Sequence, residues 1–127
     1  MFVLPIEKCQ PSQCYLSKQK VDTVRTWFSI DRLEPLPVKR IGDTIFLTDG
    51  HSRAFVAYEK GITELSLFWD TDDWPFYEDS VRACQEQGIF SIPDLAQRQL
   101  SPEEFEEKWL GFCRKLSYND KNNDCSR

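Results

Sequence analysis

The chain has 127 residues, 40% of them hydrophobic, with four Trp, nine Phe and four Tyr, and its formal net charge is −5. This composition predicts one compact domain with a substantial core, and it excludes a disordered chain except at the C-terminal end. Residues 1–69 carry nine basic and eight acidic groups (net +1), whereas residues 70–127 carry seven and thirteen (net −6). The acidic second half argues against non-specific binding to DNA, which needs a basic face.

The five cysteines bear on the redox compartment of the protein. The residues before Glu7 and Lys8 are too few for a signal segment, and no apolar run reaches transmembrane length. We therefore expect a cytoplasmic protein with reduced thiols and no membrane partner. Cys84 and Cys113 lie in helical apolar patterns, which predicts that they pack in the core.

The other three cysteines do not predict a metal site. Cys9 and Cys14 are loosely spaced and lie far from other ligands, unlike the cysteines of a zinc site. Cys125 lies in a polar tail, where we expect it to be exposed.

The first half of the chain alternates strand and helix signals. Four short strands are predicted, over residues 2–7, 38–41, 44–48 and 64–69. Ser17 is a candidate N-cap for a helix over residues 18–28, whose apolar side chains recur at helical spacing. Gly42-Asp43 predicts a hairpin turn between the second and third strands. A short helix follows the loop at residues 49–53 and is expected to end at Gly61.

Three helices are expected in the second half, after an acidic turn at residues 70–73. The first covers residues 75–87, and the second begins after a capping Ser91. Ser101 and the proline that follows it predict the start of a third helix, which should end near Leu116. That helix is expected to bury the apolar residues Phe105, Trp109, Phe112 and Cys113.

This order of elements predicts an α+β fold with a small mixed β-sheet and flanking helices, not a doubly wound sheet. We expect an α+β core over residues 1–69 and a C-terminal helical extension, packed on that core, over residues 70–117. Residues 118–127 are expected to form a flexible tail.

The most concentrated group of functional side chains is Asp49-Gly50-His51-Ser52-Arg53, between a predicted strand and a predicted helix. Free backbone N–H groups and the helix dipole favour an anion at such a place. Gly50 allows a ligand to approach the backbone closely, and the guanidinium of Arg53 suits a phosphate. His51 adds a group expected to titrate near neutrality. The alternative interpretation is an ordinary Asp-Gly turn with Ser52 as a helix cap.

Residues 1–69 resemble the ParB/sulfiredoxin-like superfamily. The resemblance rests on an N-terminal strand with a Pro-containing turn and on a hairpin that leads into Thr48-Asp49-Gly50-His51-Ser52-Arg53-Ala54. It continues through Ala57-Tyr58-Glu59-Lys60-Gly61 and the strand at residues 64–69. The helices expected over residues 75–116 resemble an addition found in small stand-alone bacterial members of this group.

The resemblance implies a nucleotide-phosphate site at the loop before the motif helix. Gly50, His51, Ser52 and Arg53 would be its phosphate-binding residues. Asp49, Gly50, His51 and Arg53 match the loop of the free serine kinases of this fold, in which a second His stands where this chain has Ser52. The implied ligands are a nucleoside di- or triphosphate with Mg²⁺ and a small-molecule acceptor.

The resemblance also suggests catalytic residues. Asp49 and His51 are the candidates in the loop, Asp49 as a group that orients a nucleophile or binds Mg²⁺. The kinases carry a Glu near the first Pro turn, and Glu7 is the nearest acid to that turn here. Asp70, Asp72 and Asp73 are further possible Mg²⁺ ligands, although a solvated turn that caps the next helix is the favoured interpretation.

The positions at which this chain departs from the family patterns rank its candidate functions. A sulfiredoxin would have Cys in place of His51, and of the ParB loop pattern only Gly50 and Arg53 are present. The first interpretation is a nucleotide-dependent phosphotransferase or NTPase, and the alternative is a nucleotide- or protein-binding module without turnover. A nuclease or a DNA-binding protein is the weakest.

Aromatic residues of the expected extension offer a possible interface. They are Trp74, Phe76, Tyr77 and Trp109. A homodimer formed through these side chains is one interpretation, and internal packing of the same side chains is the favoured one.

Overall fold

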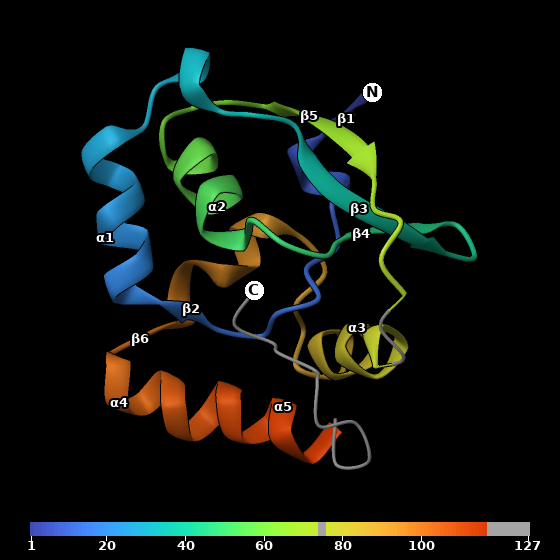
Figure 1. The fold of residues 1–127 in the computed structure, drawn as a ribbon, viewed down its shortest axis with the longest axis vertical. Coiled ribbons are helices and arrows are strands. Elements are labelled where there is room, and N and C mark those ends of the chain that lie inside the picture. The colour runs from blue at the N-terminus through green and yellow to red at the C-terminus, as the bar shows by residue number, and fades with distance from the viewer. Residues whose placement is uncertain (74–75, 117–127) are drawn as a thin grey trace.

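The computed structural model describes residues 1–73 and 76–116, and these residues form an α+β fold (Figure 1). The main sheet has the strand order β1-β5-β3-β4. Its strands are β1 (Phe2–Pro5), β3 (Leu36–Ile41), β4 (Thr44–Leu47) and β5 (Glu64–Trp69). β1 is antiparallel to β5, β5 is parallel to β3, and β3 is antiparallel to β4. The predicted α+β class with a mixed sheet is confirmed.

The β3–β4 hairpin forms where the sequence predicts it. Gly42 has a φ of 59°, a left-handed conformation that glycine adopts without steric cost. It turns the chain between Ile41 and Thr44, which are paired across the hairpin. β3 starts earlier than expected, at Leu36, because its first residues pair in parallel with β5 beginning opposite Leu67.

Helices surround this sheet. The longer ones are α1 (Lys18–Trp27), α2 (His51–Glu59) and α3 (Tyr77–Glu86). A C-terminal run follows, built from α4 (Pro102–Phe105), the π-helical η4 (Glu106–Leu110) and α5 (Gly111–Leu116). Short 3₁₀ helices lie at η1 (Ile6–Lys8), η2 (Ile30–Arg32) and η3 (Ile92–Gln97). α1 packs against α2 on one side of the molecule, and the C-terminal run lies below them in Figure 1.

A second, two-stranded sheet was not predicted. β2 (Leu16–Ser17) pairs in parallel with β6 (Gln99–Leu100), so the start of α1 is joined to the segment that leads into α4. Strands of two residues carry too little pattern to be found from sequence, and this pairing joins segments from opposite ends of the chain.

One hydrophobic core runs through both halves of the chain, and α2 lies within it. Ala54, Phe55, Val56 and Ala57 are all buried, so α2 is covered on most of its surface. The second half contributes several residues to the same cluster, namely Cys84, Ile89, Ile92, Leu95, Phe105 and Trp109. η3 contacts α2 directly. The second half of the chain therefore helps to hold α2, and with it the predicted loop, in place.

Several helix ends lie where local side chains predict them. Ser17 Oγ accepts a hydrogen bond from the N–H of Lys20 at 3.3 Å, and Ser101 Oγ accepts one from the N–H of Glu104 at 3.3 Å. Ser91 opens η3 with the predicted cap. Gly61 has a φ of 86° just after the last turn of α2, as a glycine at a helix C-terminus should.

Four expectations about local structure are wrong. α2 begins at His51, so residues 51–53 form its first turn and do not precede it as a loop. The N-cap of α2 is Gly50, not Ser52. Cys113 is buried as predicted but is disulfide-bonded, so the thiols are not all reduced. Phe112 is only partly buried.

The aromatic residues of the second half pack internally where the structure describes them. Phe76, Tyr77 and Trp109 are 4%, 6% and 2% exposed. These values favour the packing interpretation over the interface interpretation. The expectations for Trp74, Cys125 and the tail over residues 118–127 lie outside the described residues.

Candidate functional site

The chain passes from β4 into α2 through a tight turn at Gly50. Gly50 has a φ of 81°, and a Cβ atom at this position would lie 2.8 Å from Leu36 Cδ2 and 2.9 Å from Arg53 Nη2. Leu36 is fully buried and cannot move aside easily. Asp49 Oδ1 accepts a hydrogen bond from the N–H of Gly50 at 2.8 Å, which fixes the turn. The structure thus requires glycine here for both conformation and space.

The first turn of α2 carries no side-chain cap. The N–H of Ala54 donates to the carbonyl of Gly50 at 2.9 Å, which is the first bond of the helix. Helix geometry therefore leaves the N–H groups of His51, Ser52 and Arg53 without an intrahelical acceptor. Together with the helix dipole, these groups favour an anion at this end of α2.

His51 is buried, and one of its ring nitrogens is already bonded. Its Nε2 accepts a hydrogen bond from the N–H of Ser12 at 3.0 Å. Burial lowers the pKa of His51 to about 4, against the opposing effect of the negative charge of Asp49. The neutral ring that accepts at Nε2 carries its proton on Nδ1, which can donate. The prediction that His51 titrates near neutrality is therefore wrong.

Bonds to β4 fix the position of Ser12, which lies in the Pro-containing turn of the N-terminal segment. Gln10 forms a parallel bridge with Phe46 in β4, and Ser12 Oγ donates to the carbonyl of Leu47 at 2.6 Å. These bonds hold residues 10–13 along the edge of β4, next to the start of α2. Two segments that are far apart in sequence thus meet at His51.

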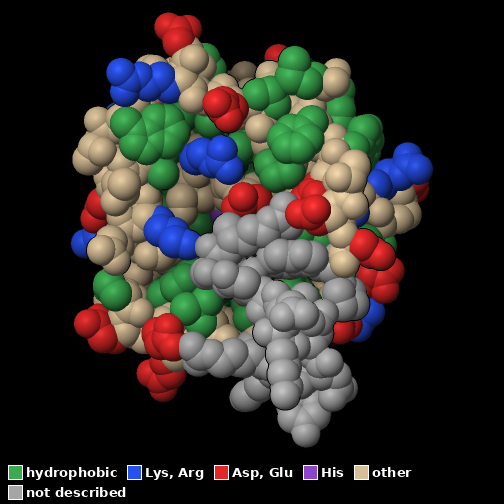
Figure 2. Space-filling view, in the orientation of Figure 1, with side chains coloured by type: hydrophobic (Ala, Val, Ile, Leu, Met, Phe, Trp, Pro, Cys, Tyr) green, Lys and Arg blue, Asp and Glu red, His purple; other side chains and the backbone are tan. Residues whose placement is uncertain are grey.

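A cavity of about 400 Å³ opens between α1 and the start of α2. It is lined by the loop residues and one face of α1, namely Gln13, Gln19, Lys20, Thr23, Val24, Trp27, Asp49, Gly50, His51, Ser52 and Arg53. Four of the five motif residues were expected to bind phosphate, and all five line this one cavity. Figure 2 shows basic and acidic side chains interspersed over the face of the molecule that carries α1 and α2.

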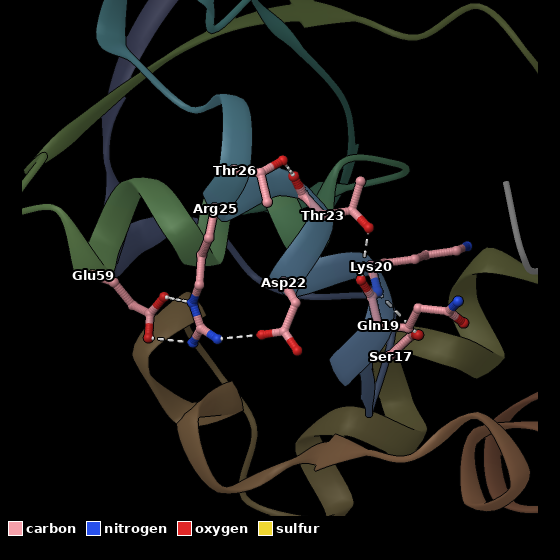
Figure 3. A network of polar contacts seen from close by, with 8 residues as sticks. All are labelled: Ser17, Gln19, Lys20, Asp22, Thr23, Arg25, Thr26 and Glu59. Carbon is pink, nitrogen blue, oxygen red and sulfur yellow. Dashed lines mark hydrogen bonds and ion pairs between the residues drawn. The ribbon is translucent and has the colours of Figure 1, made fainter.

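An ion-pair network holds the two walls of the cavity together (Figure 3). Arg25 on α1 makes two hydrogen bonds to Glu59 on α2, at 2.9 and 2.7 Å, and a third to Asp22 at 2.7 Å. A bidentate guanidinium–carboxylate pair fixes direction as well as distance. Figure 3 also shows that Lys20 extends from the same helix in another direction.

Among the described residues that line the cavity, cations outnumber carboxylates. Lys20 and Arg53 are the two cations that line it, and Asp49 is the one carboxylate among the described lining residues. Arg53 Nη2 lies 3.9 Å from Asp49 Oδ2, so this ion pair is loose. Both side chains are about 30% exposed. Trp27 supplies a half-buried aromatic surface on the same cavity. The arrangement suits a ligand that is anionic at one end and flat and apolar at the other.

Glu7 does not reach this cavity. It lies exposed in η1 and is not among the lining residues. Sequence reasoning missed Lys20 and Trp27, although the amphipathic pattern of residues 18–28 contains both. The pattern placed Trp27 on the apolar face, and nothing local showed that α1 would face the start of α2.

The sequence favours an acidic turn at residues 70–73 that caps the next helix, but the turn after β5 does not cap α3. α3 has Phe76 as its N-cap and no side-chain cap. Asp70 instead accepts a short hydrogen bond of 2.5 Å from Thr48 Oγ1 and accepts another from the N–H of Asp72 at 2.8 Å. Among the residues that the structure describes, no group of three or more His, Cys, Asp or Glu could hold a metal ion. No described helix is long and apolar enough to cross a membrane.

Comparisons with known proteins bear on the fold alone. No protein-family model matches the chain, and no curated protein matches it. The crystal structure of protein Atu1540 from Agrobacterium tumefaciens is similar, with a TM-score of 0.53 and 17% sequence identity. The match covers 92% of this chain and 68% of that one. At this identity, the similarity supports the α+β architecture and carries no activity over.

Proposed function

We propose that this protein is a ParB/sulfiredoxin-like nucleotide-phosphate-binding protein. The observation that carries the proposal is the cavity between α1 and the uncapped start of α2, which brings Arg53, Lys20 and Trp27 together. Its volume of about 400 Å³ lies in the range of small-molecule sites. The chain as a whole is acidic, so two cations facing one carboxylate at this cavity are a local feature that favours an anion.

In this proposal each wall of the cavity has its own role. The first-turn N–H groups of α2 and the guanidinium of Arg53 hold the phosphates, and Lys20 neutralises further charge. His51 donates from Nδ1 as a neutral group, since burial lowers its pKa to about 4. The base stacks on Trp27, because the flat face of a nucleobase packs well on an aromatic ring.

Turnover depends on Asp49 in this proposal. A phosphotransferase or NTPase needs a group to orient the nucleophile or hold Mg²⁺, and Asp49 is the carboxylate among the described residues that line the cavity. The alternative is a nucleotide-binding module without turnover. The remote position of Glu7 favours this alternative, because it removes a second candidate base from the site.

Calorimetric titration with ATP, ADP and CTP in the presence of Mg²⁺ tests the proposal. We expect saturable binding of at least one nucleotide and a loss of affinity of about tenfold or more in Arg53→Ala, because a charge-assisted pair is removed. Arg82→Ala is the matched control, since Arg82 is exposed on α3 and pairs with Asp79. No binding by the wild type, or equal losses in both variants, contradicts the proposal.

Asp49→Asn separates a catalytic protein from a binding module. The amide keeps an oxygen that can accept the Gly50 N–H, so the turn survives, but the charge is lost. A phosphotransferase or NTPase should keep nucleotide binding in this variant and lose product formation, as measured by chromatography of the nucleotide products. If the wild type binds nucleotide and forms no product with a panel of hydroxyl and amine acceptors, the alternative of a binding module holds.

A further inference from the structure

Two buried thiols lie against each other, and neither is among the residues that line the cavity between α1 and α2. Cys14 precedes β2, and Cys84 is on α3, 70 positions further along the chain. Their Sγ atoms are 3.1 Å apart, and both side chains are at most 1% exposed. Both thiols are free. A disulfide has an S–S distance of about 2.05 Å, so a relative shift of about 1 Å would bring the two sulfur atoms to bonding distance.

We propose that Cys14 and Cys84 are a redox-active pair, which a small peroxide such as hydrogen peroxide converts to an intramolecular disulfide. The Cys14 thiolate attacks one peroxide oxygen, the O–O bond breaks to leave a sulfenic acid, and the departing hydroxide takes up a proton from solvent and leaves as one water. The Cys84 thiol then attacks the sulfenic sulfur of Cys14. The S–S bond forms as the hydroxyl leaves with the Cys84 proton as a second water. The two sulfurs together lose two electrons, which the peroxide accepts.

The surroundings of Cys14 support its role as the attacking thiol. The hydrogen bond from Cys84 lowers the pKa of Cys14 against the effect of burial, and the nearby charge of Arg98 lowers it further. Arg98 is held in place, since its Nε donates to the carbonyl of Cys14 at 3.1 Å and its guanidinium lies 4.1 Å from the centre of the Tyr15 ring. The same hydrogen bond raises the pKa of Cys84.

Cys9 provides a contrast within the same core. It is fully buried, and its thiol lies 3.7 Å from the carbonyl of Pro5. Burial raises the pKa of Cys9 to about 12. A raised pKa leaves little thiolate to act as a nucleophile, and the contact between Cys14 and Cys84 distinguishes that pair from Cys9.

The disulfide would join two parts of the molecule. Cys14 follows directly after Gln13, which lines the nucleotide cavity, and lies two residues after Ser12, which donates to His51. α3 belongs to the second half of the chain. Oxidation would thus tie the N-terminal segment beside the cavity to α3 by a covalent bond.

Peptide mapping of the full chain tests this inference. The protein is reduced, desalted and treated with a small excess of hydrogen peroxide, then denatured, alkylated and digested without reductant. We expect a cross-linked pair of peptides containing Cys14 and Cys84, lighter by two hydrogen atoms than the free pair, and its disappearance after dithiothreitol. The melting temperature of the oxidised protein should rise by roughly 5 °C or more, because the bond closes a long loop of the unfolded chain.

Variants supply the controls. Cys9→Ser should retain the cross-link, whereas Cys84→Ser should lose it and yield Cys14 in over-oxidised forms. The map also separates the new bond from the disulfide of Cys113. Recovery of Cys14 and Cys84 as alkylated thiols from oxidised wild-type protein overturns the inference, as does their conversion to sulfinic acids without a cross-link. This measurement on the wild type does not depend on whether a variant folds.

Discussion

The two helices that wall the cavity begin in different ways. α1 starts at Ser17, whose hydroxyl accepts a hydrogen bond from the first turn. The N-cap of α2 is Gly50, which has no side chain to accept such a bond, and the first turn of α2 faces the cavity. A capped start satisfies the orphan N–H groups within the protein, whereas an uncapped start leaves them for a ligand. In the proposed function, α1 therefore serves as a wall of the cavity and the start of α2 as the anion-binding element.

Gly50→Ala should have the largest effect, because it changes the start of α2. The added Cβ would lie 2.8 Å from Leu36 Cδ2 and 2.9 Å from Arg53 Nη2, in a left-handed conformation. We expect a loss of about 3 kcal/mol in the free energy of unfolding, together with loss of nucleotide binding. Urea denaturation measures the first effect, and calorimetry the second.

Gly61→Ala is the matched control for this change. Gly61 has a similar φ of 86°, but nothing lies within 4 Å of its Cβ position. This variant should lose roughly 1 kcal/mol, from backbone strain alone. Equal losses at Gly50 and Gly61 would show that close packing at the start of α2 has no role.

The pH dependence of stability tests the buried state of His51. The folded pKa of about 4 lies below the ordinary value of 6.5, so between these values the unfolded chain binds more protons than the folded one. The stabilisation is complete above pH 6.5 and is lost as the pH falls toward 4. We expect His51 to account for a loss of about 2 kcal/mol between pH 7.5 and pH 5.

His51→Gln isolates this contribution, because its amide oxygen can accept the N–H of Ser12 and does not titrate. Urea denaturation at the two pH values should show a smaller decline for the variant than for the wild type, by about 2 kcal/mol. Parallel curves for the two proteins would mean that His51 is protonated in the folded state at pH 5.

Arg53→Lys tests whether the start of α2 binds the ligand through the guanidinium fork of Arg53 or through its charge alone. Lys keeps the positive charge but lacks the planar fork that binds a phosphate through two hydrogen bonds. We expect a nucleotide affinity between that of the wild type and that of Arg53→Ala, with a loss of about threefold to fivefold, or near 1 kcal/mol. Isothermal titration at fixed salt gives the order, and an affinity for Arg53→Lys no better than for Arg53→Ala would show that charge alone contributes nothing.

Ser17→Ala should have the smallest effect and should leave the site intact. Loss of the cap on α1 is expected to cost about 1 kcal/mol of unfolding free energy, as measured by urea denaturation. Nucleotide affinity should stay within about twofold of the wild type, because the α1–α2 pairing through Arg25 and Glu59 remains. A large loss of affinity would mean that the start of α1 also binds the ligand.

Local patterns in the sequence determined much of this protein. Ser17 and Ser101 mark helix starts, Gly42 marks a hairpin and Gly61 marks a helix end, because each acts through bonds or conformations within a few residues. The motif at residues 49–53 could be singled out for the same reason, and the α+β class followed from the order of the elements.

Contacts between distant segments decided the rest. α1 packs against α2, the Arg25–Glu59 pair bridges the two helices, and this apposition makes Trp27 part of the cavity. The neutral state of His51 arises from burial and from the N–H of Ser12, which lies 39 positions away in the chain. Desolvation and long-range pairing depend on what the folded chain brings together, and no local pattern encodes them.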